Sequence, residues 1–507
     1  MPPQDFNLYS HFQKQFASRA NEELLRDDAD RSFSYSDIDR ESARLASCLS
    51  GLGVGPGDRV TAQVEKSPEA LSLYLACLRA GFVFHPLNPA FQAGELAYFL
   101  SDAEPAAVVY DPAREAMIQP LAASAGVRRL VTLDANGQGT LIEQSRHAVE
   151  QFDTVPRDKD DLAALLYSSG TTGVPKGIML THANLLCNTE TLVDAWEFTQ
   201  DDRLLHALPI FHVHGLFVAV GCVLLSGAGM RWLPAYDAAR VIEFLPECTV
   251  MMGVPTYYTR LLARDDFGAE HCERMRVFIS GSAPLLEETF AGFEARTGQR
   301  ILERYGMTET NMNTANPLNG VRKPGTVGPP LPGVETRVTN DDGKILPVNE
   351  IGNLQVRGPN VFIGYWKLPD KTAEDFTEDG FFDTGDQGRI DEDGYVSIVG
   401  RARDMVITGG LNVYPKEVEN VIDELSGIRE SAVIGVPHPD FGEAVVAVVV
   451  TRECETLDED AVVRATKDRL ANYKIPKRVV FIDELPRNSM GKVQKKALRE
   501  TCQNLFT

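Results

Sequence analysis

The chain has 507 residues, which is too long for one hydrophobic core and predicts two to four domains. Hydrophobic residues make up 43% of it and charged residues 24%, a composition typical of a globular protein. Acidic residues outnumber basic ones by 72 to 50, and the net charge of -22 repels nucleic-acid phosphates and anionic membranes. Neither nucleic acid nor a membrane is therefore an expected partner.

The cysteines and the apolar segments favour a cytoplasmic protein. The eight cysteines are scattered and form no CxxC pair, which predicts reduced thiols and neither a disulfide framework nor a zinc site. The N-terminal sequence lacks the apolar stretch of a secretory signal. The longest apolar run, 215–230, is short for a bilayer span and contains glycines, so we interpret it as a buried helix.

Helical and strand-like patterns alternate along much of the chain. In order, we expect a helix at 34–53, a strand at 58–64, a helix at 68–81, a strand at 203–211, a helix at 241–247, and strands at 249–255 and 275–281. This order implies mostly parallel sheets covered by helices. Short strands separated by Gly, Pro and Asp predict a small β-rich subdomain at 335–339, 352–358 and 394–400.

The C-terminal part of the chain has a pattern of its own. A helix at 414–425, strands at 431–437 and 444–450, a helix at 459–471 and a strand at 477–485 follow in this order, which suggests a βαβ-like arrangement. The predicted fold class is α/β. A large N-terminal domain (1–403) would contain two α/β subdomains and a small β subdomain, followed by a small, mobile α+β domain (404–507).

The segment YSSGTTGVPKG at 167–177 directly follows an apolar strand and combines glycines, hydroxyl side chains and a lysine. Small residues let backbone N–H groups approach phosphate oxygens, and the polar side chains add further donors. The segment lacks the GK[ST] ending of a Walker motif, and a flexible surface turn is the plain alternative. The predicted phosphate-binding residues are Ser168, Ser169, Gly170, Thr171, Thr172, Gly173 and Lys176.

This segment resembles the phosphate loop of the adenylate-forming superfamily, which includes acyl-CoA synthetases, peptide-synthetase adenylation domains and luciferases. Other motifs of that superfamily follow in its order: YGMTE at 305–309, TGD at 384–386, GRARD at 400–404 and PRNSMGK at 486–492. The resemblance implies an enzyme that uses ATP and Mg²⁺ to activate a carboxylic acid as its acyl-adenylate. The acyl group would then pass to coenzyme A.

The resemblance also implies a role for single residues. Thr308 would bond the α-phosphate, and Glu309 would hold Mg²⁺, a hard cation that prefers oxygen ligands. Asp386 would accept hydrogen bonds from the ribose hydroxyls, with Arg401 helping, and Lys492 would bridge the acyl carboxylate and the phosphates during adenylation. The further ATP-binding residues that the resemblance implies are Ala283, Glu303, Tyr305 and Gly306.

The superfamily's C-terminal domain rotates between the two half-reactions, and Asp404 resembles its hinge. The lysine that usually follows the hinge aspartate is absent here, where the sequence continues as MVIT. Gly409 and Gly410 would let the backbone approach the pantetheine of CoA closely. An ordinary turn explains this glycine pair nearly as well.

The acyl pocket is harder to predict. His212, in the sequence LPIFHVHG, matches the superfamily's gating position, whereas we interpret His214 as a buried structural histidine. Arg260 and Arg304 could both reach the pocket, and a buried guanidinium needs an anion. That anion is either an internal acid, for which Glu303 is the obvious candidate, or the second carboxylate of a short diacid substrate.

The segments MGVPTYYTRLL, FISGSAPLL and LERYGMTETNMNTANP resemble the malonate-activating branch of the superfamily. On that resemblance Arg260, Ser282, Arg304 and Met307 line a malonate pocket. Methylmalonate would also fit, because a pocket discriminates one extra methyl only modestly. The implied reaction converts malonate, ATP and CoA to malonyl-CoA, AMP and diphosphate.

Three other functions stay open. The chain could activate another short-chain or aryl acid, load a carrier protein, or bind nucleotide without catalysis, although the complete lysine, glutamate and threonine set argues against the last. A lysine acetyltransferase is a further possible partner, because Lys492 lies in a polar loop where acetylation would remove its charge. We expect such acetylation to block adenylation and to spare thioester formation.

Overall fold

The computed structural model describes residues 5–169, 174–283, 285, 287–401, 405–413, 415–452, 457–486 and 493–506. The chain divides into two compact units, and each is described by itself. The first unit comprises Met1–Pro89, Leu100–Leu166 and Gly177–Val399, and the second comprises Ala90–Phe99, Tyr167–Lys176 and Gly400–Thr507. The expected domain boundary between residues 403 and 404 stays a prediction.

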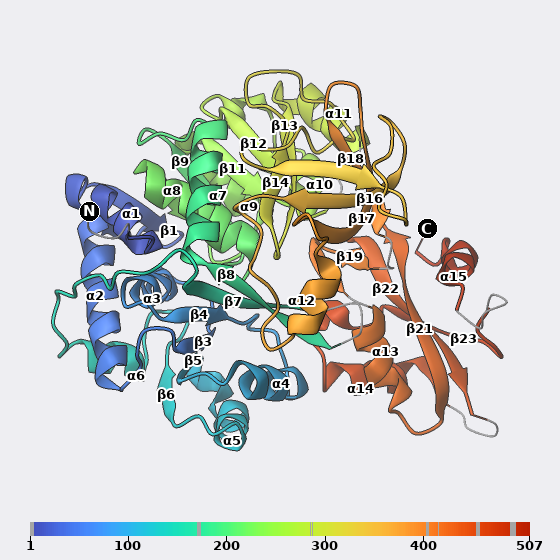
Figure 1. The fold of residues 1–507 in the computed structure, drawn as a ribbon, viewed down its shortest axis with the longest axis horizontal. Helices are drawn as coiled ribbons and strands as arrows, with labels where there is room; N and C mark the ends of the chain where they lie inside the picture. The colour runs from blue at the N-terminus through green and yellow to red at the C-terminus, as the bar shows by residue number, and fades with distance from the viewer. Residues whose placement is uncertain are drawn as a thin grey trace. The chain divides into compact units, whose positions relative to one another are not determined.

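One large sheet of the first unit has six strands in the order β6-β5-β3-β4-β7-β8 (Figure 1). The neighbours from β6 to β7 run parallel, as the alternation of strands and helices predicts. The strands are β3 (Arg59–Gln63), β4 (Val83–Pro86), β5 (Ala107–Tyr110), β6 (Arg129–Thr132), β7 (Leu162–Ser169) and β8 (Pro175–Thr181).

The second large sheet has eight strands in the order β14-β13-β12-β11-β9-β10-β1-β2. Its strands from β13 to β1 run parallel, and an antiparallel strand closes each edge. The strands are β1 (Glu23–Asp27), β2 (Ser32–Ser34), β9 (Arg203–His206), β10 (Gly229–Trp232), β11 (Val250–Gly253), β12 (Val277–Ser280), β13 (Ile301–Met307) and β14 (Asn311–Ala315).

The helices predicted at 34–53 and 68–81 are α2 (Tyr35–Gly51) and α3 (Pro68–Arg79), which pack along each other. Ser34 caps α2 through a capping box, and Ser67 caps α3 just before its proline. The other helices of the first unit are α1 (Leu8–Ser18), α5 (Glu115–Ser124), α6 (Thr140–Ser145), α7 (His182–Ala195), α8 (Val220–Ser226), α9 (Ala238–Phe244), α10 (Pro255–Leu262), α11 (Glu287–Thr297) and α12 (Pro369–Asp375), while α4 (Ala93–Ala103) begins in the second unit.

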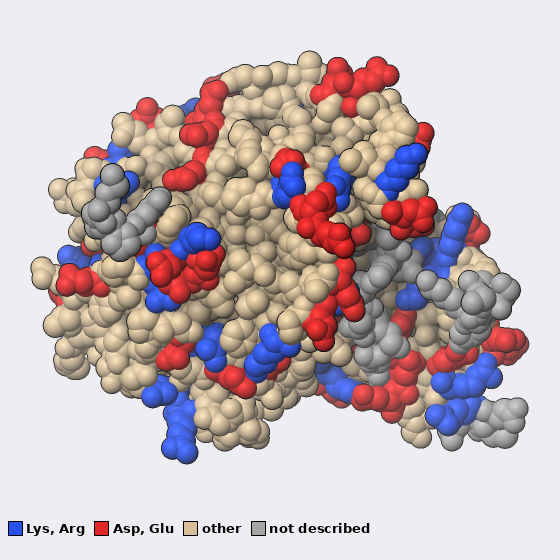
Figure 2. Space-filling view, viewed as in Figure 1, with Lys and Arg blue, Asp and Glu red and all other residues tan. Residues whose placement is uncertain are grey.

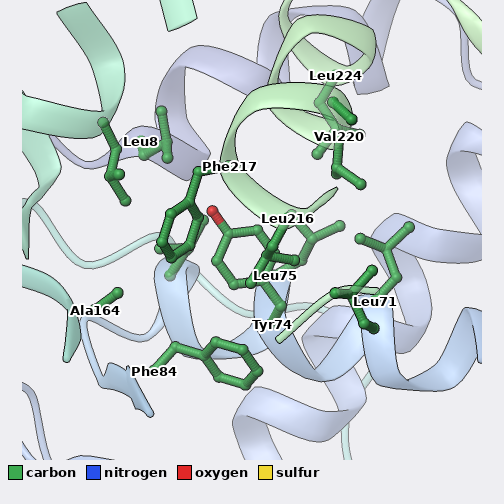
Figure 3. Packing of buried hydrophobic residues seen from close by; sticks show 14 of the residues in the cluster. Leu8, Leu71, Tyr74, Leu75, Phe84, Ala164, Leu216, Phe217, Val220 and Leu224 are labelled. Carbon is green, nitrogen blue, oxygen red and sulfur yellow. The ribbon is translucent and has the colours of Figure 1, made fainter. Parts of the chain in front are cut away.

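The apolar run at 215–230 is helical only in part. A π-helical segment, η2 (His214–Ala219), continues directly into α8, and both are buried. The helix ends at Gly227, whose φ of 80° is left-handed, and β10 begins two residues later. The prediction of one buried helix was therefore wrong for the end of the run. Figure 3 shows η2 and α8 packed against α3. The residues from η2 and α8 are Leu216, Phe217, Val220 and Leu224, and those from α3 are Leu71, Tyr74 and Leu75.

The predicted small β subdomain is a four-stranded sheet in the order β15-β16-β17-β18. Its first three strands pair antiparallel. Short turns with Gly, Asn and Asp join antiparallel strands readily, which explains why this part of the sequence differs from the rest. The strands are β15 (Glu335–Thr339), β16 (Gly352–Arg357), β17 (Phe382–Ile390) and β18 (Val396–Arg401).

The second unit contains a sheet of five strands. The long strands β21 and β22 pair antiparallel, whereas β22 and β23 are parallel with α14 between them in sequence. The βαβ-like prediction corresponds to β22-α14-β23. The pair β21 and β22 is antiparallel, because a connection of three residues can join only antiparallel strands. The elements are β19 (Val406–Thr408), β20 (Leu411–Val413), α13 (Pro415–Asp423), β21 (Ile428–His438), β22 (Gly442–Thr451), α14 (Glu459–Lys467), β23 (Arg478–Phe481) and α15 (Lys495–Cys502).

The surface carries mixed charge, and the described cysteines are free. Figure 2 shows Lys and Arg in small groups, many of them beside Asp and Glu, on the face turned to the viewer. Seven of the eight cysteines lie in the described part of the chain, where each is a free thiol. Every helix formed by the described residues is too short or too polar to cross a membrane.

Candidate active site

The end of β13 and the turn that follows it carry the YGMTE motif. Gly306 is required in this tight hairpin, because a Cβ there would lie 1.9 Å from the carbonyl oxygen of Asn311 on β14. Thr308 and Glu309 follow in the turn, and the Glu309 side chain is buried. The hairpin thus sets the motif's polar residues side by side at one edge of the eight-stranded sheet.

Two motifs that lie far apart in the sequence meet in the structure. The phenol of Tyr305 donates a hydrogen bond to the Asp386 carboxylate at 2.5 Å. The backbone N–H of Asp386 donates to Thr384 Oγ1 at 3.1 Å, and that hydroxyl donates to the Leu354 carbonyl at 2.7 Å. Asp386 is therefore a buried, oriented acceptor, a geometry that suits the ribose-binding role predicted for it.

Arg304 has the least usual environment of the predicted residues. Its side chain is 3% exposed, and its Nε and Nη2 atoms are buried without a hydrogen-bond partner among the described residues. Burial lowers the pKa of Arg304 to about 9, so the guanidinium remains charged at neutral pH. Gly281 makes room for it, because a Cβ at that position would lie 2.4 Å from the Arg304 Cζ.

Glu303 does not pair with Arg304. Successive residues of a strand point to opposite faces, so the two side chains of β13 diverge. Glu303 instead accepts hydrogen bonds from the backbone N–H groups of Leu285 and Gly325. Burial raises the pKa of Glu303 to about 8, which makes the carboxyl largely neutral at pH 7. The internal pairing that the sequence left open is thereby excluded for this residue.

The LPIFHVHG segment contributes two histidines, and the charge of Arg304 acts on one of them, His214. Loss of solvation lowers the pKa of His212 to about 4, and its ring lies 4.9 Å from that of Phe211. His214 is buried, and its Nδ1 lies 3.3 Å from the Oγ of Ser282. Burial and then the charge of Arg304 hold the pKa of His214 well below its usual value. Both imidazoles are therefore neutral at pH 7.

Arg260 lies on α10 beside two stacked tyrosines. The rings of Tyr236 and Tyr257 are 3.9 Å apart, and burial raises the pKa of Tyr257 to about 12 although the charge of Arg260 opposes that shift. Both tyrosines line a cavity of about 220 Å³, and its other walls are residues of β3, β4, α3 and the segments that follow β3, β4, β9 and β10. Met307 is partly buried against the large hydrophobic core.

Lys66 contributes to the same cavity, and the sequence offered no motif that would have identified it. Its buried amine donates to the carbonyl oxygen of His206 at 2.9 Å and lies 2.8 Å from His206 Nδ1. The opposite ring nitrogen, Nε2, donates to the carbonyl oxygen of Gly215 at 2.9 Å. A buried lysine and a histidine thereby hold the backbone at the start of η2.

The phosphate-loop residues with described positions belong to the second unit. Tyr98 donates a hydrogen bond to the Pro175 carbonyl at 2.7 Å, and the Phe99 and Tyr167 rings lie 5.0 Å apart, so aromatic side chains support the base of the loop. Lys176 is buried on β8 and Ser168 is half-buried on β7.

Several predicted residues lie outside the described part. These are Gly170, Thr171, Thr172, Gly173, Asp404 and Lys492, and the side chains of Ser169 and Arg401 are likewise outside it. Ala283 follows β12 and is half-buried. Gly409 and Gly410 form the two-residue turn between β19 and β20, with φ of 57° and 78°, as a hairpin of this length favours. Their role toward CoA stays a prediction.

The chemistry of Glu309 fits a magnesium ion that is bound together with a nucleotide. Among the described residues there is no group of three or more His, Cys, Asp or Glu side chains that could hold a metal by themselves. Mg²⁺ in nucleotide sites commonly takes one or two carboxylates and completes its octahedron with phosphate oxygens and water. The single buried carboxylate of Glu309 matches that pattern.

Family models match both parts of the chain. The AMP-binding enzyme family matches residues 12–366, and the C-terminal domain of AMP-binding enzymes matches residues 417–492. The chain therefore belongs to the AMP-binding, or adenylate-forming, enzymes. The resemblance drawn from the ordered motifs is confirmed, and so is the α/β fold class.

Within that family, similar proteins are named for malonate. A malonate–CoA ligase from Arabidopsis thaliana is 36% identical over 488 residues, which are 90% of this chain and 79% of the ligase. The structure of ATP-bound MatB from Rhodopseudomonas palustris is 51% identical, covers 99% of this chain and 100% of MatB, and superposes with a TM-score of 0.79. A malonyl-CoA ligase with methylmalonyl-CoA and AMP bound is 36% identical, with coverages of 92% and 97% and a TM-score of 0.80.

Proposed function

We propose that this chain is an ATP-dependent malonate–CoA ligase. A malonate carboxylate attacks the α-phosphate of ATP and diphosphate leaves. The CoA thiol then attacks the acyl carbon of the malonyl-adenylate, AMP leaves, and malonyl-CoA is formed. The observation that carries the choice of malonate is Arg304, a buried cation whose Nε and Nη2 have no partner among the described residues. Methylmalonate is the expected second substrate, because the structure of a relative is named for bound methylmalonyl-CoA.

A buried charge without a counter-charge is costly. A guanidinium removed from water without an anion destabilises the folded protein, and such a charge is retained where it serves a ligand. A second carboxylate on the substrate would pair with it through charge-assisted hydrogen bonds. A monocarboxylic acid of the same length would leave the charge unpaired, which gives the site a reason to select a diacid. Arg260, Ser282 and Met307 are proposed to line the same pocket.

The other site residues keep their proposed roles in adenylation. Thr308 bonds the α-phosphate, Glu309 holds Mg²⁺, and Asp386 accepts from the ribose, where the hydrogen bond from Tyr305 orients it. Magnesium would neutralise phosphate charge as two anions approach each other. His212, at the position of the superfamily's gating residue, is neutral and so adds no charge to the adenylation site.

The proposal is tested by CoA-dependent AMP formation from ATP with malonate, methylmalonate, acetate, propionate, butyrate and benzoate. We expect malonate to give the highest kcat/KM, with methylmalonate second. A preference for butyrate or benzoate would refute malonate as substrate while leaving adenylation in place. Adenylation without CoA-dependent turnover would point to the loading of a carrier protein instead.

Acetylation of Lys492 is proposed as a control point on this activity. The charge of this lysine would serve adenylation, so its loss should stop AMP formation from malonate and ATP. Synthesis of malonyl-CoA from a preformed adenylate should continue. Equal loss of both half-reactions in protein acetylated at Lys492 would contradict this proposal.

A further inference from the structure

His214 places an unused hydrogen-bonding atom next to the proposed malonate pocket. It is the first residue of η2 and is 5% exposed. Its Nδ1 lies 3.3 Å from Ser282 Oγ, whereas its Nε2 is buried without a partner among the described residues. The Nε2 of His182 is buried in the same state, so what distinguishes His214 is its place beside Ser282 and the charge of Arg304.

Three chain segments bring polar atoms to this place. Ser282 directly follows Gly281, the residue whose missing side chain accommodates the Arg304 guanidinium. Ser282 itself has a left-handed φ of 69°, which is unfavourable for a residue with a Cβ and which occurs where the surroundings impose it. Arg304 comes from β13, Ser282 from the segment after β12, and His214 from η2. Within the part of the chain that the structure describes, Arg304 Nε, Arg304 Nη2 and His214 Nε2 have no hydrogen-bond partner.

A carboxylate could satisfy these atoms together. It has two oxygens that can accept about four hydrogen bonds, and an arginine fork uses two of them. A neutral imidazole can donate one more without adding a second positive charge, so the pair of guanidinium and carboxylate stays balanced. The hydroxyl of Ser282 can donate to His214 Nδ1, which leaves the ring proton on Nε2.

We propose that His214 is a specificity-determining residue, whose Nε2–H donates to the distal carboxylate of the diacid that Arg304 binds. Ser282 is the positioning residue that fixes the ring tautomer. This inference rests on the proposed function and deepens it. It also revises the interpretation of His214 as a purely structural histidine.

Hydrogen bonds and close packing hold the backbone next to His214. The carbonyl of the next residue, Gly215, accepts a hydrogen bond from His206, which the Lys66 amine holds from the other side. A Cβ on Gly215 would lie 2.0 Å from the carbonyl oxygen of Pro209, so the backbone there is packed against its neighbour. A ligand-binding group benefits from such support, since small displacements weaken a hydrogen bond sharply.

The test compares malonate with propionate, which carries a methyl group where malonate has its distal carboxylate. The quantity measured is the ratio of kcat/KM for the two acids, in CoA-dependent AMP formation. In His214→Asn the amide cannot reach the position of Nε2, and the ratio should fall about 10- to 100-fold. In His214→Gln the amide nitrogen sits as many bonds from the backbone as Nε2 does, and most of the ratio should return.

A matched control is His147→Gln, which changes an exposed histidine and should keep the wild-type ratio. A ratio that is unchanged in His214→Asn, or no recovery in His214→Gln, would overturn the inference. An equal loss of kcat/KM for both acids would show a purely structural histidine and would also overturn it. If His214→Asn does not fold, Ser282→Ala is measured instead. Its ratio of kcat/KM for malonate over propionate should fall about 3- to 10-fold, and an unchanged ratio would refute the role of Ser282 in fixing the ring tautomer.

Wild type and Arg304→Ala, measured alongside, separate this inference from the function on which it rests. If wild type prefers propionate, the malonate proposal itself fails. If wild type prefers malonate and Arg304→Ala loses that preference while His214→Asn keeps it, the function stands and only the role of His214 is wrong.

Discussion

Substitution of Gly281 by alanine should damage the malonate pocket without touching any charged residue. The added methyl would lie 2.4 Å from Arg304 Cζ and 2.6 Å from its Nε and Nη1. Non-bonded carbon atoms rest at about 3.5 Å or more, so the guanidinium must shift by about 1 Å. Because Arg304 is buried, it has little free space into which to move.

The expected effect follows from that displacement. A shift of about 1 Å in a positioned binding group costs on the order of 100-fold in rate, so kcat/KM for malonate should fall by about that factor. Activity toward propionate, which would make no ion pair with Arg304, should fall much less. CoA-dependent AMP formation measures both.

Two further variants sharpen this prediction. Gly292→Ala on α11 is the matched control, because its Cβ would meet Leu262 Cδ1 at an ordinary 3.6 Å. In a background of Arg304→Ala, Gly281→Ala should have little additional effect, because the methyl no longer collides with a guanidinium. A full additional loss in that double variant, or an unchanged malonate kcat/KM in Gly281→Ala alone, would refute the reasoning.

Three other predictions follow from the site. Arg304→Met removes a buried charge that has no acidic partner among the described residues, so the free energy of unfolding of the ligand-free variant should rise by about 1–3 kcal/mol in denaturant titrations, although malonate should no longer stabilise it. A lower free energy of unfolding would contradict this view of the charge. Burial raises the pKa of Glu303 from 4.5 to about 8, so its contribution to stability is full below pH 4.5 and is lost as the pH rises through 8. Glu303→Gln should therefore become more stable relative to wild type across that window, by roughly 1.4 kcal/mol per pH unit at most, and parallel pH profiles of thermal unfolding would disprove it. Tyr305→Phe removes the 2.5 Å hydrogen bond to Asp386 and should raise the KM for ATP about 3- to 10-fold, with little change in the KM for malonate. An unaltered KM for ATP would show that this hydrogen bond does not contribute to nucleotide binding.

Much of the architecture could be predicted because local signals agreed with each other. Ser34 and Ser67 mark helix starts, and alternating strands and helices imply parallel sheets, which the two large sheets show. An error arose where a turn decides the outcome. Gly227 ends a helix within an apolar run, and β10 begins two residues later.

The site was predictable in parts and for different reasons. The ordered motifs identified Tyr305 and Asp386, but only folding shows that they touch across 81 residues of sequence. Strand alternation alone could have separated Glu303 from Arg304, since neighbours in a strand face opposite ways. Contacts such as His214 with Ser282, or Lys66 with His206, join segments with no shared pattern and could not be read from the sequence.

We infer that Arg304 is a buried cation kept for the second carboxylate of the substrate. The most direct measurement is the ratio of kcat/KM for malonate over propionate in wild type and in Arg304→Ala. A site built around such a polar group can reject the analogue that lacks it by about 10⁴-fold, so we expect a wild-type ratio of that order and its near-complete loss in the variant. A ratio that survives the loss of Arg304 would contradict the claim and assign this arginine a purely structural role.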